Sequence, residues 1–418
     1  MDSPRIEMIP AKPVSSLEQT IRMPVSIVIT PPSRHVGKER PPLNLSIVLD
    51  RSGSMAGDKK MPFAKKAAAM VVENLTARDR ISVVAFDDVA ELAVPSTRVE
   101  AKHRILGSIE GIHPRGGTDL HAGWLAGAGQ VLGERFEVGV NRVILLSDGQ
   151  ANQGVTDLEA IASAVKEKAS RGIQTTTIGV GRDYNEVLME RMAVEGEGQY
   201  YFVGDTVQLV DIFQTELQGL MATTGQEVTL RFLPRGSKVV EFPHSFNQTI
   251  DGAYRLPDLM AETPIRLLVV LEIPPPTEPG SLLDIELQWV DPETSAKGLL
   301  KSSLRALPAV AHAEWEAVPV DLEVEDDVVT HRLVLIQENV SRKLRERDIS
   351  GARQDLDLWK QVLAQAPPSP VQEARAEAYG ATMNAMDLED FDFGAKFLGG
   401  SALRARRGRR EAPDQDSK

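Results

Sequence analysis

The side chains best suited to chemistry in this chain are five oxygen donors that follow strand-like or glycine-rich segments. Three of them alternate in the stretch Asp-Arg-Ser-Gly-Ser at residues 50–54, directly after the apolar run 43–49. The other two follow Gly116-Gly117 and the apolar run 143–146. The five residues are Asp50, Ser52, Ser54, Thr118 and Asp148.

All five residues are hard oxygen donors, and the chain contains no cysteine. Zinc and copper are therefore disfavoured, and Mg²⁺ is the expected ion, with Mn²⁺ and Ca²⁺ as the alternatives. We expect direct bonds from the three hydroxyls of Ser52, Ser54 and Thr118, whereas Asp50 and Asp148 act through water molecules. Because the hydroxyls are neutral, the ion stays electron-poor, and a carboxylate from a partner protein can complete its coordination shell.

Each piece of this pattern has a simpler interpretation when it is taken alone. Aspartate and serine are favoured at helix N-termini, so residues 50–54 could cap a helix. Asp148-Gly149 alone is typical of a turn. The three pieces occur together, however, and two of them follow buried-type strands whose carboxyl ends meet at one edge of an open α/β sheet. This combination favours the metal site.

Three further residues are expected to contact the partner on the same face: Arg115, Asp119 and His121. We expect no catalytic residues. The alternative is a metal-dependent hydrolase, in which His113 or His121 acts as the base beside the ion. A lone histidine without an orienting partner is weak support for that chemistry.

Composition limits the partners and the location of the protein. The 418 residues carry a net charge of -13, so nucleic acid is not expected to bind the chain as a whole. The N-terminus lacks an apolar core of signal-peptide length, and no run of about 18 apolar residues is present. We therefore expect a cytoplasmic protein that makes no contact with a membrane.

Residues 43–203 alternate between strand-like and helical segments. Continuous apolar runs, suited to a sheet that is covered on both faces, occur at 45–49, 81–86, 143–146 and 175–180. Helical patterns occur at 59–75, 120–132, 158–169, 186–193 and 207–221. This alternation predicts an α/β domain at 43–222 with a doubly wound, mostly parallel sheet.

The segments around this domain predict further parts. Short strands between Pro/Gly-rich turns predict a β-sandwich at 223–310, and residues 1–42 are expected to add a strand to it, followed by a linker. An apolar stripe from Val329 to Leu344 predicts a C-terminal helical hairpin at 311–366. The tail at 367–418 is expected to be largely disordered, with a helix at 371–386 as the alternative for that segment.

The donor pattern resembles the metal-ion-dependent adhesion site of von Willebrand factor type A (VWA) domains. Asp50, Ser52 and Ser54 match the Asp-x-Ser-x-Ser of that site, and Thr118 and Asp148 match its later threonine and aspartate. The resemblance covers residues 43–222. The order of the elements after it is similar to that of bacterial intracellular proteins with this domain and, more loosely, of inter-alpha-trypsin inhibitor heavy chains.

This resemblance implies a Rossmann-like fold and a function in protein binding. It implies a non-enzymatic, Mg²⁺-dependent adaptor that captures an Asp or Glu of a partner protein. Similar intracellular bacterial proteins often act beside AAA-type ATPases, which are therefore the partner class that the resemblance implies. A surface adhesion or channel-associated protein is the other interpretation, and it requires export.

Overall fold

The structure, a computed structural model, describes residues 3–33, 39–275, 280–366, 368–406 and 408. The chain divides into two compact units. One is an α/β unit of residues 34–223 with 292–296, and it contains all five predicted metal ligands. The other comprises residues 1–33, 224–291 and 297–418. In sequence, the α/β unit is therefore inserted into the other unit.

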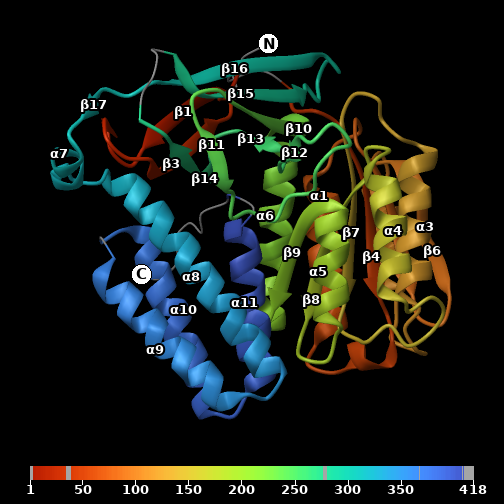
Figure 1. The fold of residues 1–418 in the computed structure, drawn as a ribbon. Coiled ribbons are helices and arrows are strands. Elements are labelled where there is room, and N and C mark those ends of the chain that lie inside the picture. The colour runs from red at the N-terminus through yellow and green to blue at the C-terminus, as the bar shows by residue number, and fades with distance from the viewer. Residues whose placement is uncertain (1–2, 34–38, 276–279, 367, 407, 409–418) are drawn as a thin grey trace. The chain divides into compact units, whose positions relative to one another are not determined.

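A six-stranded sheet forms the centre of the α/β unit (Figure 1). Its strands, in spatial order, are β6 (Ala90–Arg98), β5 (Arg80–Phe86), β4 (Leu43–Asp50), β7 (Val140–Ser147), β8 (Gln174–Val180) and β9 (Glu197–Val203). Neighbouring strands pair in parallel, except that the edge strand β6 runs antiparallel to β5. The predicted mostly parallel, doubly wound sheet is confirmed.

Helices cover both faces of this sheet. On one face, α1 (Lys60–Asn74), α2 (Lys102–Glu110) and α6 (Leu209–Met221) share an apolar cluster with alternate residues of β4. The other face carries α3 (Leu120–Gly133), α4 (Leu158–Ala169) and α5 (Glu186–Glu195). There, Gly127 of α3 lies so close to Val48 that a Cβ atom would clash. Burial on both faces explains the continuous apolar runs of the strands.

The order in which the chain adds strands to the sheet reverses between β4 and β7. The chain passes from β4 to β5 and β6 on one side, and from β7 to β8 and β9 on the other. In open α/β sheets, ligands bind outside the carboxyl ends of the strands at such a reversal. Asp50 is the last residue of β4, and Asp148 directly follows β7. The sheet thus places both carboxylates at the position where a ligand is expected.

Two antiparallel sheets form the strand-rich part of the other unit. The first contains, in spatial order, β1 (Arg5–Pro10), β3 (Ile21–Thr30), β14 (Ile265–Ile273) and β11 (Lys238–Glu241). The second contains β12 (Tyr254–Arg255), β10 (Thr223–Pro234), β15 (Ser281–Val290) and β16 (Lys297–Arg305), and β13 (Leu259–Met260) also pairs with β10. The short strands β2 (Ser15–Ser16) and β17 (Ala309–Val310) form a separate parallel pair.

One apolar cluster joins the two antiparallel sheets. It includes Ile27 of β3, Val269 of β14 and Ile285 of β15. Residues 21–29 of β3 pair with β14, although residues 34–223 of the α/β unit lie between the two strands in sequence. Additional strands beside the α/β domain are therefore part of the fold.

The C-terminal region contains more helix than the predicted hairpin. After the short α7 (His312–Ala317), α8 (Leu322–Arg345) and α9 (Ile349–Gln365) correspond to that hairpin. The expectation of a largely disordered tail at 367–418 is wrong for α10 (Pro370–Asp387) and α11 (Phe391–Arg406). Residues 409–418 of the predicted tail lie outside the described residues. No helix within the described ranges combines the length and apolar character that a membrane span requires.

The two additional helices form because their apolar side chains are buried by the hairpin. Trp359 of α9, Ala378 of α10 and Leu398 of α11 belong to one apolar cluster with α8. Ser341 Oγ of α8 also donates to the Ala395 carbonyl oxygen of α11 at 2.8 Å. The apolar surface that buries α10 and α11 belongs to α8 and α9, earlier in the chain. The composition of the tail alone therefore gives no sign of it.

Two buried histidines in the unit outside the α/β unit predict that the stability of the protein decreases at acidic pH. His244 Nδ1 lies 2.8 Å from the Arg406 carbonyl oxygen, and His244 Nε2 accepts from Leu268 N at 2.9 Å, so a neutral ring satisfies both contacts. His331 packs edge-on against it, with ring centroids 4.4 Å apart. Burial lowers the pKa of His244 to about 3 and that of His331 to about 4, although the nearby Asp327 carboxylate raises both.

Because both pKa values lie below the ordinary value of about 6.5, protons bind the unfolded state more tightly, and stability falls as the pH drops below about 6.5. His331→Phe removes one titrating ring and keeps a similar shape. We expect this variant to reduce the loss of unfolding free energy between about pH 7 and pH 4 by roughly 3 kcal/mol. Urea denaturation at both pH values measures the loss. His103→Phe, at an exposed position, is the control, and the same pH dependence in both variants would contradict the prediction.

Candidate metal centre

The five predicted donors come from three loops at the carboxyl edge of the sheet. Asp50 ends β4, and the following 3₁₀ turn, η1 (Gly53–Ala56), carries Ser54. Thr118 lies just before α3, and Asp148 follows β7. The buried strands therefore bring together polar residues that are as much as 98 positions apart, from Asp50 to Asp148.

The side-chain oxygens of these loops converge. Ser52 Oγ lies 3.0 Å from Ser54 Oγ, and Ser54 Oγ donates to Asp148 Oδ1 at 2.7 Å. A Cβ atom placed on Gly149 would lie 3.3 Å from Thr118 Oγ1, and 3.7 and 3.9 Å from the hydroxyls of Ser54 and Ser52. The absence of a side chain at Gly149 thus leaves open a space that three hydroxyls surround.

Asp50 is fully buried and accepts hydrogen bonds at both carboxylate oxygens. Oδ1 accepts from Ser52 N at 2.8 Å, and Oδ2 accepts from Ser147 Oγ at 2.5 Å. Burial raises the pKa of Asp50 to about 6, even though these hydrogen bonds lower it, and the neighbouring Asp148 raises it further. The charged form of Asp50 is therefore disfavoured, and a cation beside it would relieve that cost.

The donor set fits a hard divalent cation. It offers two carboxylates and three hydroxyls, which are oxygen ligands of the kind that Mg²⁺ and Ca²⁺ prefer. Within the described part of the chain, no three His, Cys, Asp or Glu side chains gather in a way that could hold a metal. Hydroxyls therefore make up most of this candidate site.

Lys60 is a residue of the site that the sequence reasoning missed. Its Nζ donates to Asp148 Oδ2 at 2.6 Å, and both side chains are buried. Lys60 is the first residue of α1, where the positive end of the helix dipole disfavours a cation. A lysine at the start of a predicted helix, directly after the donor loop, was the signal available in the sequence.

The loop after β7 holds Thr118 in place. Thr118 N donates to Asn152 Oδ1 at 3.0 Å, and the Thr118 carbonyl oxygen accepts from Asn152 N and Gln153 N at 3.2 and 3.3 Å. The loop that carries Asp148 therefore also positions the threonine donor, so two of the three donor loops are joined by main-chain contacts.

An ion-pair network around the buried Asp87 joins the loop of Asp50, Ser52 and Ser54 to the loop of Thr118. Asp87 Oδ2 accepts from Arg51 Nε at 2.9 Å and from Arg115 Nε at 2.7 Å. Glu91 pairs with both guanidinium groups, at 2.7 and 3.2 Å. The Asp87 carbonyl oxygen accepts from Asp119 N at 2.7 Å. Arg51 lies between two of the donors in sequence, so the network links their loop to the loop of the threonine donor.

The three residues predicted to contact a partner also have structural roles. The Arg115 side chain is 60% exposed although it belongs to the Asp87 network. Asp119 caps α3, since its Oδ1 accepts from Ala122 N at 2.9 Å. His121 is half-buried in the first turn of α3, and burial lowers its pKa. Contact of these side chains with a partner stays a prediction.

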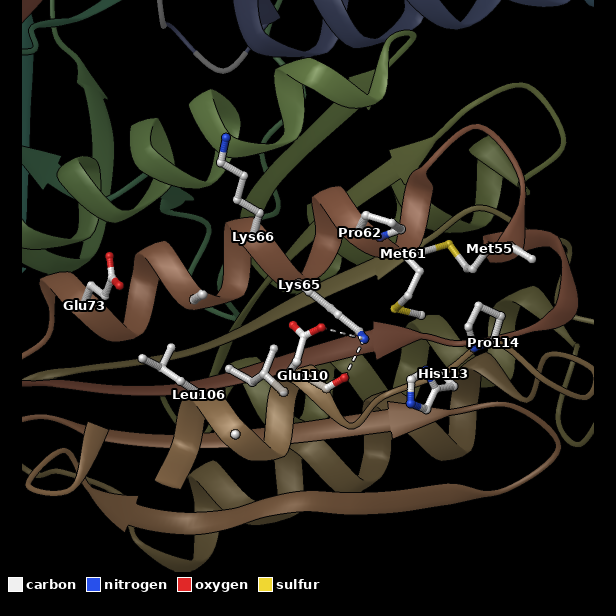
Figure 2. Close-up of a pocket in the computed structure, with 14 residues that line it drawn as sticks. Met55, Met61, Pro62, Lys65, Lys66, Glu73, Leu106, Glu110, His113 and Pro114 are labelled. Atoms are coloured by element: carbon white, nitrogen blue, oxygen red, sulfur yellow. Dashed lines mark hydrogen bonds and ion pairs between the residues drawn. The ribbon is translucent and has the colours of Figure 1, made fainter. Parts of the chain in front are cut away.

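A groove of about 820 Å³ opens beside the donor loops, between α1 and α2 (Figure 2). Met55 of η1 and Met61 of α1 lie at its end nearest the donor loops, together with His113 and Pro114 of the loop that leads to the threonine donor. Figure 2 shows Lys65 extending from α1 to α2, where it donates to a main-chain carbonyl oxygen at 2.6 Å. The groove therefore adds apolar surface next to the candidate site.

Comparison with known sequences identifies the family of the α/β unit. The family model of the von Willebrand factor type A domain matches residues 44–215. Uncharacterized protein YfbK of Escherichia coli is 30% identical over 192 residues, which are 46% of this chain and 33% of that protein. Uncharacterized protein sll0103 of Synechocystis is 26% identical over 333 residues, which are 75% of this chain and 76% of that protein. Inter-alpha-trypsin inhibitor heavy chain H4 of Homo sapiens is 28% identical over 223 residues, 48% of this chain and only 24% of that protein.

Solved structures share the fold at lower sequence identity. A von Willebrand factor type A protein from Catenulispora acidiphila has a TM-score of 0.69 at 17% identity and covers 87% of both chains. The ArnB paralog VWA2 from Sulfolobus acidocaldarius has a TM-score of 0.62 at 17% identity, covering 98% of this chain and 100% of that chain. These likenesses support the fold, including strands and helices outside the α/β unit.

Proposed function

Residues 44–215 of the chain are a von Willebrand factor type A domain. From this premise we propose that the protein is a Mg²⁺-dependent adaptor, which captures an acidic side chain of a partner protein. Domains of this family commonly serve protein interaction and typically bind a divalent metal at the adhesion site. The residues that would hold the ion here are Asp50, Ser52, Ser54, Thr118 and Asp148. A bound Mg²⁺ supplies an electron-poor position that a carboxylate can fill.

The observation that supports this proposal most is the convergence of three hydroxyls around Gly149. Neutral donors outnumber the two carboxylates, and one carboxylate, Asp148, is already paired with Lys60. The chain's own residues therefore provide little negative charge for a divalent ion. A carboxylate from outside would supply the missing charge, and the exposed Ser54 lies at the solvent side of the site.

The partner itself is proposed by class only. Arg115, Asp119 and His121 are the residues of this face that we propose to contact it, and Arg115 has a largely exposed side chain. An AAA-type ATPase is the candidate partner that the family resemblance implies, and a cytoplasmic location is proposed with it. The chain spans only a third of YfbK and a quarter of heavy chain H4, so no activity of those whole proteins is transferred.

Substitution of one neutral donor tests the metal site. We expect Ser54→Ala to weaken Mg²⁺ and Mn²⁺ binding by roughly tenfold or more, because even residues that only orient a metal ligand contribute 10–100-fold to affinity. Isothermal titration calorimetry of the full chain measures this change. Ser108→Ala, at an exposed position of α2, is the control and should bind both ions like the wild type. Equal binding by Ser54→Ala and wild type would exclude the site.

A second measurement separates the adaptor from a hydrolase. An adaptor binds N-acetyl-aspartate amide more tightly when Mg²⁺ is present, and a chelator abolishes the difference. Catalysis would instead need a base near the ion. Turnover of simple esters or phosphoesters by the purified chain, lost in His121→Ala, would contradict the adaptor proposal.

A further inference from the structure

We propose that Lys60 shifts the two binding steps of the metal site in opposite directions. Its ammonium group weakens binding of the ion alone and strengthens binding of the partner's carboxylate to the ion-loaded site. This inference rests on the proposed metal-dependent function and adds a residue that decides how the site responds to its two ligands.

The position of Lys60 runs against two general preferences. Lysine is rarely buried, yet this residue is only 8% exposed. The first turn of α1, which it begins, contains no acidic residue, so a cation there meets the unfavourable end of the helix dipole. The 2.6 Å ion pair with the fully buried Asp148 is what compensates both costs.

Gly181 lies next to the end of the Lys60 side chain. A Cβ atom on Gly181, in the loop after β8, would lie 3.4 Å from Lys60 Cε and 3.5 Å from Nζ. Gly181 has φ +77°, a backbone conformation that favours glycine. The loop after β8 therefore packs beside the ammonium group of Lys60, next to its ion pair with Asp148.

The charges of the site show the consequence. Asp50 and Asp148 contribute two negative charges, and Lys60 cancels one of them. A bound divalent ion then leaves the site with one net positive charge, which a partner's carboxylate neutralises. If residue 60 were neutral, the ion alone would neutralise the two aspartates, and an added carboxylate would make the site negative.

Lys60 therefore acts in opposite directions on the two ligands. It repels the metal ion, and it attracts the carboxylate that follows. By linkage, a carboxylate that binds the ion-loaded site raises the apparent affinity for the ion. At a given carboxylate concentration this rise is larger with Lys60 than without it, because the charged ammonium group makes the ion-loaded site bind the carboxylate more tightly. Metal and partner would bind together more strongly than either binds alone.

Lys60→Met tests the inference, because methionine keeps the length of the stem and removes the charge. We expect this variant of the full chain to bind Mn²⁺ on the order of tenfold more tightly in chloride buffer, as calorimetry measures. With acetate replacing chloride at the same ionic strength, Mn²⁺ affinity should rise clearly in the wild type and several-fold less in Lys60→Met. Lys66→Met, which removes an exposed charge of the same helix, should behave like the wild type.

A purely structural role of Lys60 gives a different pattern. Loss of a structural ion pair would weaken Mn²⁺ binding, and weaker or unchanged Mn²⁺ binding by both Lys60→Met and Lys60→Gln would overturn the inference while leaving the metal site intact. Failure of the wild type to bind Mn²⁺ would instead overturn the proposed function itself. Circular dichroism melting of each variant checks that the chain is folded.

Discussion

Asp50→Asn is expected to weaken Mg²⁺ or Mn²⁺ binding by about 100-fold or more and, at the same time, to leave the metal-free chain at least as stable as the wild type. Asparagine can accept from Ser52 N and contact Ser147 Oγ as the aspartate does. It lacks, however, one of the two negative charges of the site, and unit charges about 4 Å apart interact by about 4 kcal/mol near a protein surface.

The two effects have opposite signs because the Asp50 carboxylate is buried. Its pKa is raised to about 6 in the folded chain, so the ionised form is destabilising above the unfolded pKa of about 3.9. Near neutral pH, removing the charge is therefore expected to raise the unfolding free energy by about 1–3 kcal/mol. Such a costly carboxylate is typical of a site kept for function.

Calorimetric metal titration and urea denaturation without metal measure the two effects. Asp183→Asn, which removes an exposed carboxylate from the loop after β8, is the control and should change neither quantity strongly. The prediction fails if Asp50→Asn retains wild-type metal affinity, or if it loses affinity only because the metal-free chain is unfolded.

Asp87→Ala is expected to destabilise the α/β unit by about 3–5 kcal/mol and to reduce metal affinity by roughly tenfold. The change removes the buried acceptor that Arg51 and Arg115 share, and the buried Arg51 keeps the ion pair with the exposed Glu91. Removal of one partner from a buried ion pair is strongly destabilising. Because Arg51 lies between Asp50 and Ser52, the donor loop would lose its connection to the loop of Thr118. Reduced metal affinity follows from this loss of alignment.

The matched control is Glu91→Gln, which alters the exposed carboxylate of the same network. The Glu91 side chain is 56% exposed, and exposed ion pairs contribute about 0–1 kcal/mol. We therefore expect a small change in stability and no change in metal affinity. Denaturation and metal titration of both variants test whether Asp87→Ala has the larger effect. Comparable losses of stability and metal affinity in Glu91→Gln and Asp87→Ala would show that Asp87 has no special positioning role.

Much of the α/β unit could be predicted because its signals are local. The apolar runs at 45–49, 81–86, 143–146 and 175–180 lie within β4, β5, β7 and β8, whose residues are buried on both sides of the sheet. The edge strand β6 was missed because half of its residues face solvent and its pattern is weakly apolar. Periodicity identifies fully buried strands more reliably than half-exposed ones.

The C-terminal region shows where local signals fail. The α8–α9 hairpin was predicted from its own apolar stripe. The segment of α10 could be read as a helix or as part of a disordered tail, and that of α11 was read as tail, although Met386 and Leu398 are buried with α8 and α9. Whether a weakly apolar segment folds depends on the surface that another segment offers to it, because helix stability in proteins comes mostly from such packing.

The sequence by itself determined the chemistry of the candidate site: the hard oxygen donors Asp50, Ser52, Ser54, Thr118 and Asp148, their order, and the strands that carry two of them. Adjacency in the chain is sufficient for that, because a donor that directly follows a buried strand must emerge at the end of the sheet. Only the tertiary structure decided which charges remain available there. It pairs Asp148 with Lys60 and commits Arg115 to Asp87, and such ion pairs form between residues brought together by folding, whose separation in the sequence has no fixed spacing.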